Sequence, residues 1–214
     1  GDHRDLHLSI RRQRQMCIRD SHTLGPLIGW DKVRLHAQTV QLAEHGMEID
    51  FGGFGKEYAA DRAWAAMQAL GARHGYANLA GDMRFLGPRP DGTPWQIGIQ
   101  HPRNPGQAIA TIPMSSGGLA TSGDYEKYFE QNGRRYCHIL HPRTGMPVTH
   151  WRTVSVMAPL AVVAGSAATI AMLQGATGLA WLQASALHFL AIDCDGKLHT
   201  QARADPTAPA QPNP

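Results

Sequence analysis

A glycine-rich turn followed by a lysine is the strongest chemical signal in this sequence, within the stretch Asp50-Phe-Gly-Gly-Phe-Gly-Lys-Glu-Tyr-Ala-Ala-Asp61. The pattern predicts that a strand ends, the chain turns sharply, and a helix begins near Lys56. Free N–H groups at such a helix start favour an anion, and Lys56 adds a mobile positive charge. The stretch is not a Walker A loop, because Asp50 replaces its first glycine and Glu57 its serine or threonine. Phosphate binding is one interpretation, and a tight turn with a solvated lysine is the other.

Two further polar stretches follow predicted strands. In Asn78-Leu-Ala-Gly-Asp-Met-Arg84, the Asn and Asp beside a glycine could bind a polar ligand or brace an Asx-turn. From the residues alone, the turn is the favoured interpretation. The stretch Ala120-Thr-Ser-Gly-Asp-Tyr-Glu126 offers two hydroxyls, a glycine and a carboxylate. The alternative there is a helix cap, with Thr121 or Ser122 opening a short helix.

The stretch Tyr136-Cys-His-Ile-Leu-His-Pro-Arg-Thr-Gly145 contains two histidines. On an extended strand His138 and His141 would face opposite sides, so they are a weak zinc signal. His138 could accept a proton, and Arg143 could contact an anion. Cys137 is a poor candidate nucleophile, because no partner base is specified by spacing.

Composition limits the class of protein. The chain has 214 residues, of which 43% are hydrophobic and 17% charged, with a net charge of +3. This excludes a charged disordered chain, and the lack of a basic stripe with interleaved aromatics argues against nucleic-acid binding. Three cysteines without a CxxC pair support neither a disulfide framework nor a cysteine zinc site. The uncharged region between Arg152 and Asp193 is interrupted by Pro, Gly, Gln and His, so we expect core and no membrane span.

Alternating and helical periodicities predict the elements that position these residues. The longest expected helix covers 56–70, and two more cover 160–173 and 178–184. Strands are expected at 33–35, 40–43, 76–80, 83–86, 95–100, 108–113, 118–121, 135–140, 154–157 and 186–192, with one more after the turn 193–196. Several meander-like strands with few helices predict an α+β fold with mostly antiparallel sheets flanked by helices.

Taken together and in this order, four motifs resemble the ApbE family of FAD:protein FMN transferases. They are DxGGxxK, NxxGDxRxxG, TSGDYExYF and HIxxPRTGxP, and the resemblance runs from about Gly25 to about Gln201. It implies an ApbE-like flavin transferase fold with FAD as substrate. It also implies a Mg²⁺-assisted transfer of FMN from FAD onto a Thr or Ser hydroxyl of an acceptor flavoprotein, with release of AMP. The alternatives are a FAD pyrophosphate hydrolase, or a non-catalytic flavin-binding or assembly protein.

The resemblance also assigns roles to residues. It implies catalytic roles for Lys56, Asp124 and His138, with His138 beside the acceptor hydroxyl. Its implied FAD contacts are Gly53, Gly55 and Lys56 at the phosphates, Asn78, Gly81 and Asp82 in the flavin pocket, Thr121, Ser122, Gly123 and Asp124 at the nucleotide, and His138.

A metal site is implied as well, and here the chain departs from the family pattern. Thr169 matches a metal-ligating threonine, although by itself a threonine in such an apolar helix would more often bond its own helix carbonyl. The usual Asp four residues before it is Gly165, and Glu57 replaces a common glycine after Lys56. A hard dication favours carboxylate oxygen, so we hypothesise that Glu57, Thr169 and the Gly55 carbonyl hold the metal. His141 likewise stands where an Asp is usual.

The resemblance divides the chain into three parts. Residues 1–22 are expected to be a disordered segment outside the family, 23–201 an ApbE-like domain incomplete at its N-terminus, and 202–214 a disordered tail. Family members carry a larger N-terminal portion, of which only Gly25–Ile49 is expected here. A periplasmic location, or one at the outer face of the inner membrane, is implied by the family. Membrane association would then depend on an anchor in a missing N-terminal part.

Overall fold

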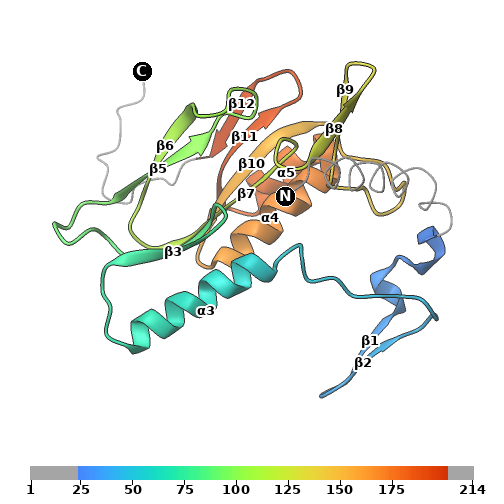
Figure 1. Ribbon diagram of the computed structural model, residues 1–214, viewed down its shortest axis with the longest axis horizontal. Helices are drawn as coiled ribbons and strands as arrows, with labels where there is room; N and C mark the ends of the chain where they lie inside the picture. Colours follow the sequence, from blue (N-terminus) through green and yellow to red (C-terminus); the bar gives the residue numbers. More distant parts are fainter. Residues whose placement is uncertain (1–23, 202–214) are drawn as a thin grey trace, which may run out of the picture.

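The computed structural model describes residues 24–201, and a six-stranded sheet forms its centre (Figure 1). All neighbouring strands in this sheet are antiparallel. The α+β class with mostly antiparallel pairing is therefore confirmed. In spatial order the strands are β12 (Leu198–Gln201), β11 (His188–Asp193), β10 (Trp151–Ala158), β7 (Gly117–Gly123), β4 (Asp82–Gly87) and β3 (Gly75–Leu79).

Two helices, α3 (Gly55–Ala69) and α4 (Ala161–Gln174), pack on one face of this sheet. The α4 side chains Ala164, Ala168 and Ala171 are fully buried. Small side chains let the helix axis approach the sheet closely. At Gly118 in β7 the approach is so close that a Cβ would lie 2.6 Å from the Leu160 carbonyl carbon. This packing fixes α4 over the middle of the sheet.

The opposite face is covered by a β-hairpin of β5 (Trp95–Gln100) and β6 (Ala108–Met114). Ile99 and Met114 of the hairpin pack in one cluster with Phe85 and Leu119 of the sheet. Side chains alternate between the faces of a strand, so Leu119 lies in this cluster while Ala120 lies in the cluster with α4. The central sheet is therefore buried on both sides.

By length and composition alone, the helical run Ala161–Ala184 could cross a membrane. In the fold it is divided by the turn η4 (Gly175–Thr177) into α4 and the short helix α5 (Gly178–Ala184), which pack against each other. Leu182 of α5 is fully buried in the same cluster as the α4 alanines. The alanines of α4 and Leu182 thus lie in the core, whereas Val163 and Ile170 of the same run are exposed.

A hairpin of β8 (Tyr128–Gln131) and β9 (Arg134–Cys137) extends from the end of β7 and corrects the sequence prediction. A single strand was expected over 135–140, and β8 was missed. Asn132 and Gly133 both have positive φ angles, 53° and 72°, as a tight two-residue hairpin turn requires. The Asn-Gly pair was the available signal for this hairpin.

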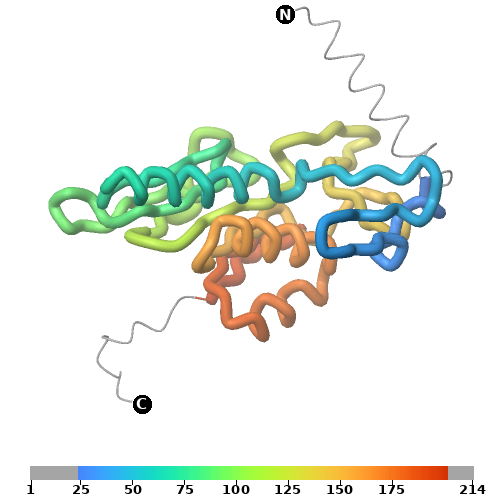
Figure 2. Tube along the Cα trace, turned by 90° about the horizontal axis from the view of Figure 1, so that it is seen from below, coloured from blue at the N-terminus to red at the C-terminus, as the bar shows by residue number. Residues whose placement is uncertain are grey.

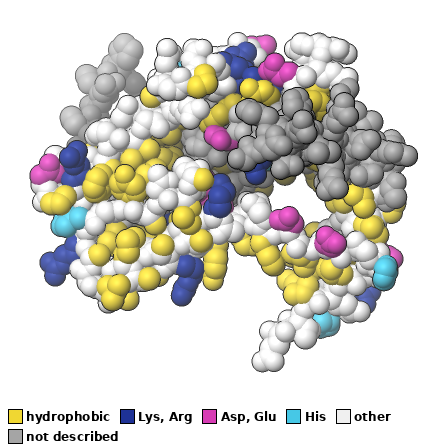
Figure 3. Space-filling view, in the orientation of Figure 1, with side chains coloured by type: hydrophobic (Ala, Val, Ile, Leu, Met, Phe, Trp, Pro, Cys, Tyr) yellow, Lys and Arg dark blue, Asp and Glu magenta, His cyan; other side chains and the backbone are white. Residues whose placement is uncertain are grey.

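Residues 24–54 form an arm beyond the N-terminal end of α3 (Figures 1 and 2). It contains the turns η2 (Gly25–Leu27) and η3 (Trp30–Lys32) and the hairpin of β1 (Val33–Leu35) and β2 (Val40–Leu42). A space-filling view shows a hollow between this arm and the body (Figure 3). Trp30 and Phe51 of the arm are 71% and 62% exposed. The expected segments 1–22 and 202–214 lie outside the described residues.

Candidate functional site

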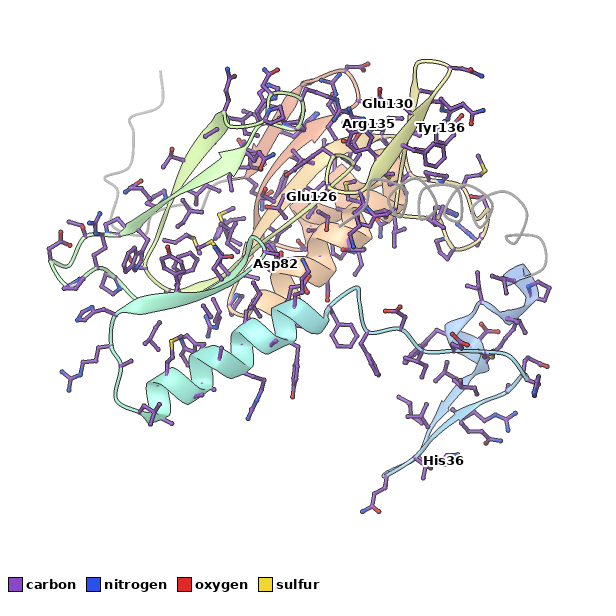
Figure 4. The ribbon with its side chains drawn as sticks, in the orientation of Figure 1. His36, Asp82, Glu126, Glu130, Arg135 and Tyr136 are labelled. Carbon is purple, nitrogen blue, oxygen red and sulfur yellow. The ribbon has the colours of Figure 1, made fainter. Side chains whose placement is uncertain are left out.

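Lys56 joins the first two motifs, because its Nζ lies 2.6 Å from Oδ2 of Asp82. Asp82, labelled in Figure 4, lies beside the N-terminal end of α3. The side chain of Asp82 is almost completely buried, whereas half of the lysine side chain is exposed. Partial burial lowers the pKa of Lys56, but the hydrogen bond and charge of Asp82 outweigh it, helped by Glu57 and Glu126. The net pKa is raised. Lys56 is therefore a stable cation at the start of α3.

The glycine turn presents an open backbone next to this cation. The N-cap residue Phe54 makes no side-chain capping bond to the first turn of α3. The amide of Gly55 donates to the carbonyl of Phe51 at 2.7 Å, which closes the turn. A Cβ built at Gly53 or Gly55 would meet no atom of residues 24–201 within 4 Å. A helix start of this kind, with a lysine beside it, can hold an anionic group.

Glu57, the next residue of α3, is buried against α4. Only 6% of it is exposed, and its Oε2 has no hydrogen-bond partner within residues 24–201. Burial raises the pKa of Glu57, and the charge of Asp82 raises it further, although its own backbone amide and Lys56 oppose this. The carboxylate lies against Gly165, where any side chain would collide with it.

Asp61 fixes α3 and α4 relative to each other. Its two carboxylate oxygens accept hydrogen bonds from the amides of Ala161 and Val162, at 2.9 and 3.0 Å. Asp61 also pairs with the buried Arg84 at 3.1 Å, and the Arg84 guanidinium lies 4.4 Å from the centre of the Trp64 ring. A residue on one helix thus caps the N-terminus of the other.

The third motif is divided between the two faces of β7. Ser122 Oγ lies 3.0 Å from Thr169 Oγ1 on the α4 side. Thr121 Oγ1 lies 2.8 Å from Ser155 Oγ, in the neighbouring strand β10. Both residues belong to a strand, so the alternative of a helix cap at this position is wrong. The structure brings Ser122 to Thr169 and directs Thr121 away from it.

Asp124 is held by an arginine that the sequence did not single out. Arg103 forms two parallel hydrogen bonds with the carboxylate of Asp124, both at 2.7 Å. Arg135 also approaches Asp124 at 3.9 Å. The hydrogen bond to Asp124 raises the pKa of Arg103. Asp124 is therefore an ion-paired group at the end of β7.

His138 follows β9 and is oriented by the backbone. Its Nδ1 lies 3.2 Å from the carbonyl oxygen of Lys127, and only the protonated nitrogen can donate to that oxygen. This contact selects the tautomer in which Nε2 carries the lone pair. Partial burial lowers the pKa of His138, against the smaller opposing effect of this hydrogen bond. The ring is therefore prepared to accept a proton at Nε2.

The remaining candidates have structural partners or lie apart. The side chain of Asn78 accepts a hydrogen bond from the Gly81 amide at 2.9 Å, which confirms the Asx-type turn. Gly123 packs so closely on the Tyr125 ring that a Cβ would meet its Cδ1 at 2.8 Å. Cys137 is 3% exposed, and burial raises its pKa, so it is no reactive thiolate.

Within the described part of the chain, no group of three or more His, Cys, Asp or Glu side chains could hold a metal. His138 and His141 accordingly belong to no such group there. A cation at this place would need Glu57, hydroxyl and carbonyl oxygens, and oxygens of its own ligand. The sequence did not single out Arg103, and it gave no role to Asp61 or Arg84, which lie in the first two motif stretches, because the partners of all three are remote in sequence.

Comparison with known proteins gives a family for this arrangement. Residues 11–191 match the model of the ApbE family. A curated FAD:protein FMN transferase of Haemophilus influenzae is 32% identical over 149 residues, covering 66% of this chain and 43% of that protein. The Escherichia coli K12 protein of the same name is 32% identical over 142 residues, covering 65% and 40%. The chain thus spans about two fifths of the length of these relatives.

Solved structures agree with the fold. The ApbE protein of Thermotoga maritima superposes with a TM-score of 0.78 at 31% identity, covering 85% of this chain and 60% of that one. The flavin transferase ApbE of Vibrio cholerae gives a TM-score of 0.75 at 25% identity, covering 87% and 60%.

Proposed function

Because this chain belongs to the ApbE family, we propose that it transfers FMN from FAD to a Thr or Ser hydroxyl of an acceptor flavoprotein and releases AMP. The names of the relatives, FAD:protein FMN transferase, support this activity. One observation carries the proposal. Lys56 forms an ion pair with Asp82, which brings the first two motifs together at the start of α3. Beside this pair, Cβ atoms at Gly53 and Gly55 would meet no atom of residues 24–201 within 4 Å.

This helix start suits the diphosphate of FAD. The diphosphate is anionic, and it would meet the positive end of the α3 dipole with Lys56 beside it, although the Gly55 amide is already bonded to Phe51. Asp82 orients the lysine ammonium with one hydrogen bond, which leaves its other N–H groups for phosphate oxygens. Gly53 and Gly55 let the phosphates approach the backbone closely.

His138 supports the transfer step. The hydroxyl oxygen of the acceptor forms a bond to the phosphorus of the FMN half, the P–O bond to the AMP half breaks, and AMP leaves with the bridging oxygen. The hydroxyl proton moves to Nε2 of His138, which its contact with Lys127 keeps unprotonated. The lowered pKa keeps this nitrogen free at neutral pH.

A divalent cation, Mg²⁺ in our proposal, fits the oxygen atoms beside this turn. When bound, it would neutralise charge on the diphosphate oxygens. The hydroxyl of Thr169 and the carbonyl of Gly55 are proposed to hold it, and the unpartnered Oε2 of Glu57 shows that a buried acceptor is available. The location that we propose, periplasmic or at the outer face of the inner membrane, rests on the family resemblance alone.

Incubation of the full chain with FAD, Mg²⁺ and an acceptor flavoprotein carrying a threonine at its flavinylation site tests the proposal. Covalent flavin fluorescence on the acceptor is the expected result. Free FMN and AMP without labelled acceptor would show a FAD pyrophosphate hydrolase. Bound but intact FAD would show a flavin-binding protein without catalysis.

A further inference from the structure

We propose that Glu57 is the carboxylate ligand of the divalent cation in this chain, and that Gly165 is small so that this carboxylate can lie against α4. The inference rests on the proposed metal-assisted FMN transfer and names the residue that completes its metal site. The proposed site depends on the contact between Glu57 on α3 and Gly165 on α4.

The Glu57 side chain is buried, and one of its carboxylate oxygens is unpartnered. It is 6% exposed, and its Oε2 is buried without a hydrogen-bond partner in the described residues. Lys56, the adjacent cation, is bonded to Asp82, so within the described residues the Glu57 carboxylate is bonded by its own backbone amide and Oε2 has no partner. Burying a carboxylate without compensation is costly, and a bound cation provides that compensation. Oxygen ligands of this kind are those that Mg²⁺ and Mn²⁺ prefer.

The Glu57 side chain lies directly against Gly165 of α4. A Cβ at Gly165 would lie 2.7 Å from Cγ of Glu57 and 2.8 Å from its Cδ. Such contacts are far shorter than carbon atoms tolerate, so a side chain at 165 would require the Glu57 carboxylate to move from its observed position. In the observed conformation the carboxylate of Glu57, on α3, occupies the position that a side chain at 165 would enter.

The register of α3 and α4 places Glu57 one turn of α4 from Thr169. Asp61 caps Ala161, and one turn away along each helix Glu57 lies against Gly165. The helices therefore run antiparallel here, and one further turn of α4 leads to Thr169, toward the glycine turn at the start of α3. The Thr169 hydroxyl lies 3.0 Å from that of Ser122. The Glu57 carboxylate and the two hydroxyls thus lie about one turn of α4 apart, on the side where the diphosphate is proposed to bind.

This arrangement has a consequence for ligand binding. Glu57 follows Lys56 directly and lies in the first turn of α3. A cation held by Glu57 would therefore stabilise the same turn that offers its amides to phosphate. We expect cation binding and diphosphate binding to reinforce each other through the first turn of α3.

Titration of the full chain with Mn²⁺ alone tests the ligand without any transfer reaction. Free Mn²⁺ is measured by electron paramagnetic resonance, and the melting temperature is followed in parallel. The wild-type chain is expected to bind Mn²⁺ and to melt at a higher temperature with it. Glu57→Gln is expected to weaken binding by at least about 100-fold, because loss even of an outer partner costs about 10–100-fold.

Two controls make the result decisive. Without metal, Glu57→Gln should melt at the same or a higher temperature than the wild type, since it removes a buried unpartnered charge. Glu126→Gln neutralises a nearby exposed carboxylate and should retain Mn²⁺ binding. Unchanged binding in Glu57→Gln, or equal loss in both variants, would overturn the proposal, as would a wild-type chain that binds no Mn²⁺.

Exchanging the residue types at positions 57 and 165 tests the contact between Glu57 and Gly165. Gly165→Asp alone should destabilise the apo chain, because it displaces the Glu57 side chain and places a second carboxylate beside it. The double variant Glu57→Gly with Gly165→Asp should fold and regain Mn²⁺ binding. A folded double variant that binds no better than Glu57→Gln would overturn the exchange. None of these readouts requires FMN transfer, so a chain that binds Mn²⁺ at Glu57 but labels no acceptor would refute only the proposed function.

Discussion

The carboxylate of Asp61 on α3 accepts a hydrogen bond from the amide of Ala161, the first residue of α4, at 2.9 Å. The two residues are 100 positions apart in the sequence. A helix N-terminus is commonly capped by its own preceding residue, but Leu160 has no side chain that can accept a hydrogen bond. The cap is therefore a tertiary contact, and it sets the register in which Glu57 meets Gly165.

Replacing Asp61 should destabilise the whole fold. Asp61→Asn removes the charge that compensates the buried Arg84 and weakens the cap of α4. Breaking a buried pair by neutralising one partner costs about 3–5 kcal/mol, so we expect a loss near the lower end of that range. Urea denaturation measures it. Asp195→Asn, at an exposed position, is the matched control and should change stability by less than about 0.5 kcal/mol; an equal change in both variants would contradict the role of the cap.

Neutralising Lys56 should weaken FAD binding. Lys56→Met removes a charged donor, and such hydrogen bonds contribute about 1.5–3 kcal/mol, or about 10–100-fold in affinity. Quenching of flavin fluorescence measures the dissociation constant. The exposed and remote Lys197→Met should bind FAD like the wild type. If Lys56→Met also binds FAD like the wild type, the lysine does not contact the diphosphate.

The pH dependence of transfer should follow His138. Because partial burial lowers its pKa below the ordinary 6.5, the ring becomes neutral, and able to accept a proton, at a pH below that value. We expect kcat/KM to rise with pH through a midpoint below 6.5 and then to stay level. In the same window the folded chain binds fewer protons than the unfolded chain, so this group favours the folded state as pH rises.

His138→Asn should lower the rate by about 100-fold or more and remove this acid limb. His36→Asn, in the exposed β1–β2 turn labelled in Figure 4, should leave the profile intact. An NMR titration of the His138 ring with a midpoint above 6.5 would contradict the assignment, whatever the activity.

The contribution of the Arg103–Asp124 pair to stability should depend on its geometry as well as on its charges. Arg103→Lys keeps the charge but cannot form two parallel hydrogen bonds with one carboxylate. We expect it to lose about 1 kcal/mol of stability, and Arg103→Met somewhat more, measured as shifts of the melting midpoint. Arg143→Lys, at an exposed position, is the comparison. Equal melting of wild type and Arg103→Lys would show that charge alone matters.

Local sequence patterns were sufficient to predict most of the helices and strands. The predicted strand at 95–100 and the helix at 178–184 have the observed bounds, and the helix expected over 56–70 is α3, Gly55–Ala69. Alternation and helical spacing depend only on near neighbours, so these predictions needed no tertiary information. The strand predicted over 135–140 is observed as the shorter β9, Arg134–Cys137, and its partner β8 was missed because the Asn132-Gly133 turn signal was overlooked.

The sequence by itself therefore determined the α+β class, the order of the motifs and the ApbE family, since each depends on residue types at short spacing. Only the tertiary structure decided which of these residues meet. It paired Lys56 with Asp82, 26 positions away. It placed Ser122 and Thr121 on opposite faces of β7. It also placed Glu57 against Gly165. Contacts between remote residues depend on how helices and strands pack in three dimensions, and the spacing of residues along one chain does not contain that information.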